Sequence, residues 1–249
     1  MDLSERFTKE LERLECDYAF YYRRQGERAL SFSTREHFRS ASILKVPILL
    51  AWLHLEQLGE VDREELCDLD AEPQVQGSGL SWLLRKRVMP YHDALLLMIA
   101  LSDNLCTNLV IRRAGIQRLN QVFGSVFGLQ GTRLERRFMD YEARAAGLDN
   151  WISAGDCVRY FDLLDALIPK DRAWVDSLLA ANTDDGLLMR NIPRDTVTFY
   201  HKTGSMEGVL HDWGYSADAN AFLLTENVSD ETNVYRVLDA LGPLVMGQI

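Results

Sequence analysis

Apolar residues at helical spacing open the chain, and β-rich runs follow them. The helical set comprises Leu3, Phe7, Leu11 and Leu14. Because residues three and four apart share one face of a helix, this spacing predicts an amphipathic helix within residues 1–14. Residues 17–22 and 29–33 are rich in strand-forming types, and the turn-forming Gln25-Gly26-Glu27 separates them. The two runs therefore predict a β-hairpin directly after the first helix.

Helical patterning dominates the middle of the chain. It resumes at Ser42 and continues to about Leu58, where Gly59 is placed to end the helix. Further helices are predicted over residues 91–101, 105–113, 116–127, 154–166 and 172–179. Strand character returns only over residues 196–202, 210–217 and 221–226, before a last helix at 231–244.

Strands at both ends of the chain, with helices between them, predict a sheet assembled from the two termini. We therefore expect an α+β fold, a three-layer α/β/α sandwich whose antiparallel sheet carries an inserted helical lobe. No internal repeat and no Pro/Gly linker divides the sequence. A single domain over residues 1–249 is expected, with a sheet lobe at about 1–38 and 190–249 and a helical lobe at about 39–189. The cleft between the lobes is the natural place for a site.

The composition of the chain says more about which partners are expected than about the fold. The 249 residues are 47% hydrophobic and carry a formal net charge of −10. This charge disfavours a nucleic-acid partner, because phosphates are neutralised by clustered Lys and Arg. The four cysteines lack metal-ligand and disulfide-framework spacing: Cys16, Cys67, Cys106 and Cys157. We expect free thiols, no metal, no cofactor, and a monomer that acts on a small-molecule substrate.

The ends and apolar stretches of the sequence bear on its compartment. The first 14 residues are rich in charge and have no apolar core like that of a signal peptide. No stretch approaches the length of a membrane span. A full-length chain is therefore expected to be cytoplasmic, whereas a chain whose leader had been removed would be periplasmic or secreted.

A nucleophile that can be activated occurs where the first long helix begins. In Ser42-Ile43-Leu44-Lys45 the lysine follows the serine by three residues, so both side chains share one helix face. A serine hydroxyl needs a base within hydrogen-bond reach to become a good nucleophile. The apolar neighbours of Lys45 would lower its pKa enough for it to act as that base near neutral pH. The same string also fits an ordinary helix start.

A second serine string, Ser102-Asp103-Asn104, lies between two predicted helices. Asp and Asn in such a place cap the following helix by accepting hydrogen bonds from its free N–H groups. The functional alternative gives Ser102 a proton-relay role and directs Asn104 at a substrate carbonyl or at Lys45. Asp103 would then hold the loop.

A third string, Lys202-Thr203-Gly204-Ser205, ends the β-rich run that begins at residue 196. A glycine in a strand often marks the close approach of a ligand to the backbone. Lys202 and the two hydroxyls would bind a carboxylate, and the N–H of Ser205 would stabilise an oxyanion. The alternative is a plain edge strand that carries a protective lysine.

Together the three strings resemble the signature set of serine β-lactamases and penicillin-binding proteins. Their order and spacing, and the extended string from Ser102 to Asn108, are similar to class A β-lactamases over about residues 15–245. The resemblance implies the β-lactamase/transpeptidase fold and a mechanism through an acyl-serine.

The resemblance also implies a role for each residue of the three strings. Ser42 would be the acylated nucleophile and Lys45 its activator, while Ser102 would pass a proton to the leaving nitrogen with help from Lys202. Asn104 would bind the side-chain amide of the substrate. Thr203 and Ser205, with Gly204 between them, would bind the substrate carboxylate. The backbone N–H groups of Ser42 and Ser205 would form the oxyanion hole.

The sequence departs from the family at the step that releases the acyl group. Class A enzymes carry, on an Ω-loop, a glutamate that activates the deacylating water. Aligning Leu134 and Arg136 with the start of that loop places Phe138 at the glutamate position. A phenyl ring cannot activate water, so we expect acylation to outpace release. Arg136 and Asp149 would form the ion pair that closes such a loop.

Three substitutes for missing groups follow from the same alignment. Asp140 or Glu142 could reach the site by a different loop path and act as the base. The family's arginine after the Lys-Thr-Gly strand is absent, and His211 and Asp212 occupy its neighbourhood. His211 is therefore a candidate helper in carboxylate binding.

Three functions remain open at this stage. The leading hypothesis is a β-lactamase-like serine hydrolase that opens a β-lactam amide through acyl-Ser42, with slow deacylation. The second is a penicillin-binding, D-Ala-peptidase-like or esterase-like hydrolase. The third is a sensor that β-lactams or peptidoglycan peptides acylate with almost no turnover. The absent glutamate favours the second and third hypotheses, and the intact trio in one compact domain favours the first.

Overall fold

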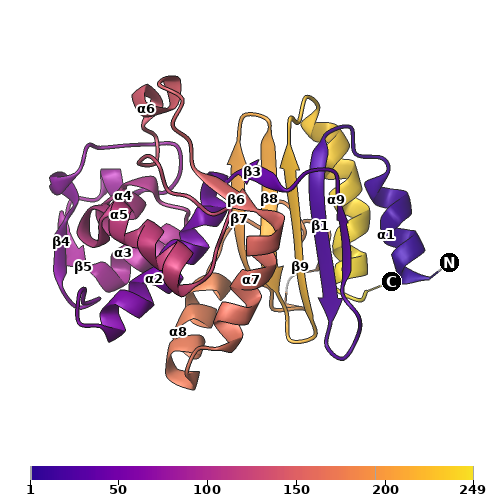
Figure 1. Ribbon diagram of the computed structural model, residues 1–249, viewed down its shortest axis with the longest axis horizontal. Helices are drawn as coiled ribbons and strands as arrows, with labels where there is room; N and C mark the ends of the chain where they lie inside the picture. Colours follow the sequence, from indigo (N-terminus) through magenta and orange to yellow (C-terminus); the bar gives the residue numbers. More distant parts are fainter. Residues whose placement is uncertain (1, 194, 249) are drawn as a thin grey trace.

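The computed structural model describes residues 2–193 and 195–248, which form three layers around an antiparallel sheet (Figure 1). Across the described residues this sheet has five strands in the order β2-β1-β9-β8-β7. The strands are β1 (Asp17–Arg24), β2 (Leu30–Ser33), β7 (Tyr200–Met206), β8 (Val209–Tyr215) and β9 (Ala219–Glu226). Both ends of the chain contribute strands, with helices inserted between them. The predicted α+β sandwich is therefore confirmed.

Two terminal helices cover one face of the sheet, α1 (Leu3–Leu11) and α9 (Glu231–Val245) (Figure 1). A capping box starts α1, because Asp2 accepts from the Glu5 N–H at 2.8 Å and Glu5 accepts from the Asp2 N–H at 2.9 Å. Phe7 packs its ring against Phe20 of β1 with centroids 4.9 Å apart. This layer buries the outer face of the sheet and leaves the inner face for the rest of the chain.

The inner face is covered by α7 (Ala154–Asp165), with α8 (Pro169–Ala180) packed beside β7 (Figure 1). Trp213 of β8 stacks on Phe161 with ring centroids 4.6 Å apart and donates from Nε1 to the Cys157 carbonyl at 2.8 Å. The indole therefore contributes apolar area to the core while its one polar group is satisfied.

The remaining helices form the inserted lobe around α2 (Lys45–Gln57). They are α3 (Tyr91–Ala100), α4 (Asn104–Ala114), α5 (Ile116–Gln121) and α6 (Tyr141–Ala145), with short turns η2 (Leu69–Ala71), η3 (Ser81–Leu83) and η4 (Val122–Val126). Most side chains of α2 are buried, as expected of a helix that is apolar on all sides and runs through a core. Pro47 lies in the first turn of α2, where backbone N–H groups have no acceptor within the helix, so the N–H that proline lacks is not missed. The central position of α2 explains why Lys45 has no access to solvent.

Several predicted elements begin at different residues than expected, and two of these differences bear on the site. The helix expected from Ser42 starts as a 3₁₀ turn, η1 (Ala41–Leu44), and becomes α-helical only at Lys45. The strand expected over 196–202 is β7, which starts at Tyr200 and continues to Met206. It runs on because Glu207-Gly208 forms a tight hairpin to β8, with Gly208 at a φ of 74°. The Lys202–Ser205 string thus lies inside the strand rather than at its end.

Four short strands escaped the sequence prediction because three residues are too few to show an alternation. They are β3 (His37–Arg39), β4 (Leu66–Asp68), β5 (Val88–Pro90) and β6 (Trp151–Ser153). β3 pairs with β6, and the Ser40 N–H donates to the Asn150 carbonyl at 2.8 Å. This small ladder fixes the end of the 134–150 loop beside the segment that carries Ser42.

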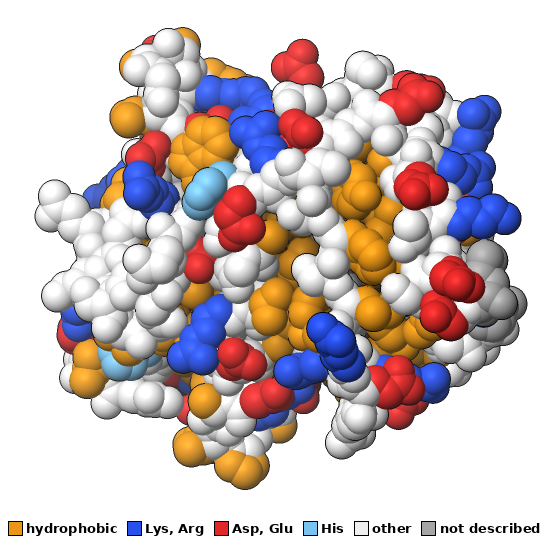
Figure 2. Space-filling view, turned by 45° about the vertical axis from the view of Figure 1, so that its right-hand side comes forward, with side chains coloured by type: hydrophobic (Ala, Val, Ile, Leu, Met, Phe, Trp, Pro, Cys, Tyr) orange, Lys and Arg blue, Asp and Glu red, His pale blue; other side chains and the backbone are white. Residues whose placement is uncertain are grey.

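The surface shows no preference for one sign of charge on the face drawn in Figure 2, where basic and acidic side chains are interspersed. In the described part of the chain, no helix combines the length and the apolar character needed to cross a bilayer. The four cysteines there are free thiols.

Candidate active site

Ser42 lies on the turn that precedes α2 and is packed against β7. Ala41 before it has a φ of 41°, a left-handed conformation that the surrounding structure must stabilise. Gly204 of β7 makes the contact possible, because a Cβ at this position would lie 3.0 Å from the Ser42 backbone nitrogen. The N–H of Ser42 is thereby held beside the strand that carries Ser205.

Lys45 is fully buried, and its amine is surrounded by oxygen acceptors. Nζ donates to the Ser102 carbonyl at 2.6 Å, to Ser102 Oγ at 3.0 Å and to Asn104 Oδ1 at 3.0 Å. Burial, followed by repulsion from the Lys202 ammonium, holds the pKa of Lys45 well below its ordinary value. Among the described residues no hydrogen bond joins Lys45 to Ser42, so the hydroxyl that its amine contacts directly is that of Ser102.

Asp103 both caps a helix and holds the loop. Its carboxylate accepts from the Cys106 N–H at 2.9 Å in the first turn of α4. It also accepts from the N–H of Leu80 at 2.9 Å and from the N–H and hydroxyl of Ser81 at 2.8 and 2.7 Å. Gly79 is needed for this approach, since a Cβ there would lie 2.1 Å from an Asp103 oxygen. The two interpretations of Asp103 are therefore both correct.

Asn104 and Ser102 are fixed by the same loop. Besides accepting from Lys45, the Asn104 amide donates from Nδ2 to the Gln76 carbonyl at 3.1 Å. Ser102 has a φ of 54°, which is uncommon for a residue other than glycine. The strained backbone turns the Ser102 hydroxyl and carbonyl toward one amine.

The β7 residues form the other part of the site. Lys202 is fully buried, and its Nζ donates to the Thr203 carbonyl at 3.0 Å. Burial lowers the pKa of Lys202 to about 8, although the carboxylates of Asp184 and Asp212 act in the opposite direction. Thr203 Oγ1 donates to Asp184 Oδ2 at 2.7 Å. Ser205 is exposed, precedes the last residue of β7 and lines the cavity described next.

A cavity of about 370 Å³ opens beside Ser42, between η1, the 134–150 loop and the end of β7. Its lining includes Ser42, Asn104, Phe138, Arg144, Ser205 and Glu207. A small molecule in this cavity would lie next to Ser42, the predicted nucleophile, and next to Asn104.

Phe138 presents an apolar ring to the amine of Lys45. The ring is 8% exposed, and its centroid lies 4.7 Å from Lys45 Nζ. Asn108 fixes the backbone of Phe138 on both sides, donating to its carbonyl at 3.0 Å and accepting from its N–H at 2.8 Å. The structure thus fixes a phenyl ring beside Lys45, and the assignment of Phe138 to the family's glutamate position stays a prediction.

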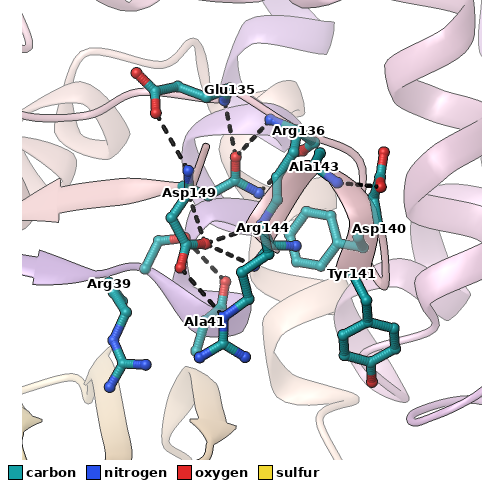
Figure 3. A network of polar contacts seen from close by, with 12 residues as sticks. Arg39, Ala41, Glu135, Arg136, Asp140, Tyr141, Ala143, Arg144 and Asp149 are labelled. Carbon is teal, nitrogen blue, oxygen red and sulfur yellow. Dashed lines mark hydrogen bonds and ion pairs between the residues drawn. The ribbon is translucent and has the colours of Figure 1, made fainter. Parts of the chain in front are cut away.

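The loop that carries Phe138 is closed by the expected ion pair. Arg136 donates from Nε and Nη2 to Asp149 Oδ1 at 2.9 and 2.6 Å (Figure 3). Arg144 adds a second cation, with Nε 3.7 Å from Asp149 Oδ2. The Asp149 N–H also donates to Glu135 at 3.3 Å. The loop is therefore a fixed wall of the cavity.

Comparison with known proteins agrees with this geometry. The family model described as the Beta-lactamase enzyme family matches residues 2–242. The chain belongs to the Beta-lactamase enzyme family. A search of curated proteins finds no match.

Solved structures of related proteins share the fold of this family member. A β-lactamase from Sphaerobacter thermophilus is 22% identical, with a TM-score of 0.85 over 99% of this chain and 97% of that one. An ancestral class A β-lactamase is 23% identical, with a TM-score of 0.84 over all of both chains. A PBP-A variant with leucine changed to glutamate, in an acyl-enzyme complex with penicillin G, is 21% identical, with a TM-score of 0.82 over 99% and 97%.

Two candidate bases of this β-lactamase family member lie away from the cavity. Asp140 is the N-cap of α6, and its carboxylate accepts from the Ala143 N–H at 2.9 Å (Figure 3). Glu142 lies in the first turn of that helix and is exposed. Because α6 projects from the molecule (Figure 1), the structure does not bring either carboxylate to Ser42.

His211 is also engaged elsewhere. Its Nδ1 accepts from the Thr225 N–H at 3.0 Å, and its Nε2 donates to the Arg39 carbonyl at 2.9 Å. Burial lowers the pKa of His211 to about 4, so the ring is neutral at physiological pH. Both nitrogens are used to join strands, which leaves the ring no group with which to bind a carboxylate.

Sequence reasoning missed three charged residues of the site, one of which, Glu207, directly follows β7 and lines the cavity. The other two lie outside the segments that carry the three strings. Arg144 lines the cavity from α6, and Asp184 contacts Thr203 from the segment between α8 and β7. Neither belongs to a string with recognisable spacing, and the contact of Asp184 spans 19 residues of chain. The Asp-Asp-Gly sequence at 184–186 is typical of a turn, but it does not indicate which strand that turn contacts.

Proposed function

We propose that this family member is a serine hydrolase that acylates Ser42 with a β-lactam and releases the acyl group slowly. The observation that supports the proposal best is the buried amine of Lys45, hydrogen-bonded to Ser102 beside the nucleophile and covered by Phe138. The Lys45 amine favours formation of an acyl-enzyme, and the Phe138 ring disfavours its hydrolysis.

In the proposed reaction Ser42 Oγ attacks the lactam carbonyl carbon and gives its proton to the neutral amine of Lys45. The depressed pKa of Lys45 makes the neutral form available. Ser102 donates its proton to the leaving nitrogen as the C–N bond breaks, and the Lys45 ammonium returns a proton to Ser102. The N–H groups of Ser42 and Ser205 stabilise the oxyanion.

Release of the acyl group needs an activated water, and the proposed site is poorly equipped for it. Loss of a positioned general base typically slows a step by about 10²–10⁴-fold. The carboxylates that line the cavity are Asp149, which is engaged by Arg136, and Glu207, which follows β7. The ring of Phe138, whose centroid lies 4.7 Å from Lys45 Nζ, cannot act as a base.

A second candidate function is a penicillin-binding or sensor protein that is acylated without turnover. The phenyl ring over Lys45 favours it over an efficient β-lactamase. A relative with this fold, a PBP-A variant, was obtained as an acyl-enzyme with penicillin G. The two candidates share the acylation step and differ in the lifetime of the adduct.

One experiment separates these functions. The protein is mixed with a chromogenic cephalosporin while colour and intact mass are followed together. We expect a stoichiometric burst, an adduct on Ser42 and slow further colour; a long-lived adduct with no further colour would indicate the binding protein.

Two variants provide the controls. Ser42→Ala should give neither burst nor adduct, whereas Ser177→Ala, on the exposed surface of α8, should behave like the wild type. An adduct that persists in Ser42→Ala would refute the proposal.

A further inference from the structure

Thr203, to which the resemblance assigns the binding of the substrate carboxylate, already donates a hydrogen bond to a carboxylate of this chain, that of Asp184. Thr203 is 4% exposed, and its hydroxyl donates to Asp184 Oδ2 at 2.7 Å. Asp184 itself is exposed, so it covers Thr203 from the solvent side. Because a hydroxyl has a single proton to donate, the donor that a substrate carboxylate would need is already used.

The segment that carries Asp184 is fixed between the two halves of the site. Thr183 donates from its N–H and its hydroxyl to the Ala100 carbonyl, at 3.1 and 3.3 Å. Ala100 is the last residue of α3, two residues before Ser102. The Gly186 N–H donates to Asp184 Oδ1 at 3.3 Å, which orients the carboxylate. Asp184 is therefore held between the end of α3, next to the Ser102 loop, and β7.

The charges around Thr203 are unfavourable to a further anion. Asp212 lies opposite Thr203 in the β7–β8 register and is 1% exposed. Its two oxygens are used by His201 Nδ1 and by the Leu188 N–H, both at 3.0 Å. Asp185 lies 3.8 Å from His201 Nε2. Although burial acts in the opposite direction, the Asp212 carboxylate raises the pKa of the buried His201 ring to about 9. Three carboxylates thus lie around the buried side chains of His201 and Lys202, and Asp184 is the one in contact with Thr203.

We propose that Asp184 determines specificity for acylation: the preferred acyl donor carries an uncharged or cationic group, not a carboxylate, at the Thr203 end of the site. The inference rests on the proposed acylation of Ser42. An incoming carboxylate would meet Asp184 and no free donor on Thr203, and like charges brought together cost binding energy. An amide N–H, a hydroxyl or an ammonium group would instead donate to Asp184.

Penicillin G and its methyl ester test the assignment, because they differ only in the carboxylate. The rate of adduct formation on Ser42 is measured by intact mass for each compound and divided by that compound's rate with hydroxide. We expect the ester to acylate the wild type about tenfold faster than the acid. Raising the salt concentration from about 0.05 M to about 0.5 M should narrow this ratio, because exposed charges are screened.

Two variants identify the residue responsible. Asp184→Asn keeps the shape of the side chain and removes its charge, so the rate with penicillin G should rise about tenfold while the rate with the ester changes by less than about twofold. Asp185→Asn removes the same charge from the neighbouring residue, whose carboxylate lies near His201 rather than on Thr203. It should keep the wild-type ratio.

Several results would overturn the assignment. Equal normalised rates for the acid and the ester in the wild type would do so, as would a ratio that survives in Asp184→Asn. Loss of the ratio in Asp185→Asn as well would show that no single carboxylate is responsible. If neither compound gives an adduct with any of the proteins, the proposed acylation fails, and the inference fails with it. That result differs from adducts formed at equal rates.

Discussion

The two walls of the cavity beside Ser42 are fixed to a similar degree but offer different chemistry. On one wall Lys45, Ser102 and Asn104 are joined by hydrogen bonds of 2.6–3.0 Å. On the other, an ion pair closes the 134–150 loop and Asn108 holds both backbone groups of Phe138. The second wall does not lack rigidity, but it presents an apolar ring to the Lys45 amine, where the proposed hydrolysis would need a base. Under the proposed function, the two walls therefore govern different steps, the formation and the release of an acyl group.

The largest expected effect concerns the first wall. Lys45→Met keeps the length of the side chain and removes its amine, so Ser42 loses its proton acceptor. We expect acylation by a β-lactam to slow by about 10²–10⁴-fold, the usual cost of losing a general base. The rate of adduct formation, followed by intact mass, measures this loss.

The control for this variant is Lys86→Met, which removes an exposed lysine outside the site. It should acylate at the wild-type rate. Acylation of Lys45→Met within about threefold of the wild type would contradict the assignment of Lys45 as the base.

A smaller gain is expected on the second wall. Phe138→Glu places a carboxylate on a backbone that Asn108 already holds, next to Lys45 Nζ. We expect the acyl-enzyme to hydrolyse about 10–100-fold faster, less than the full effect of an evolved base because the surroundings are packed around a ring. After free β-lactam is removed, the half-life of the adduct is measured by mass.

The matched variant for this prediction is Phe138→Leu, which opens similar space without supplying a base. Its adduct should persist as in the wild type. If Phe138→Glu and Phe138→Leu release the acyl group at the same rate, access of water rather than its activation limits release.

The sequence allowed the fold to be predicted because its elements are long and their periods distinct. The apolar residues of α1, a helix of nine residues, and of α9, a helix of 15 residues, follow a helical spacing, so a strand is not a reasonable alternative for either. The three-residue strands β3 and β6 carry no such signal, yet they anchor the loop beside Ser42. Their formation depends on a pairing across more than 100 residues, which local patterning does not encode.

Contacts among the three recognisable strings could be predicted, and contacts of residues outside those strings could not. Ser42 and Lys45 are three residues apart in one string. Asn104 of the second string accepts a hydrogen bond from Lys45, which was one of the two roles suggested for it; the other was binding a substrate carbonyl. The contact between Thr203 and Asp184 joins a strand to a loop, and no spacing rule connects them. His211 was a reasonable candidate from its position along the chain, but strand pairing turned both ring nitrogens to backbone partners.

The smallest expected effect is a shift of pH dependence on the first wall. The ammonium of Lys202 helps to lower the pKa of Lys45, so Lys202→Met should raise that pKa. Acylation needs the neutral amine of Lys45, and its rate therefore rises with pH through this pKa. In the variant the rising limb should move to higher pH, by about one unit or less. Rates with the methyl ester of penicillin G between about pH 5 and pH 10 measure the shift without interference from a substrate carboxylate.

Lys202→Arg is the matched variant for this last prediction, since it keeps a positive charge at the same place. Lys202 itself has a pKa of about 8, so its charge is present over the lower part of the range and is lost above it. Arginine stays charged throughout, so the rise of the acylation rate with pH should occur at the wild-type pH or at a slightly lower pH. If Lys202→Met slows acylation equally at every pH, the lysine acts by positioning Thr203, to whose carbonyl it donates, rather than through the charge that Lys45 experiences. A uniform loss would then place Lys202 with the substrate-binding residues of β7, and the depressed pKa of Lys45 would rest on burial alone.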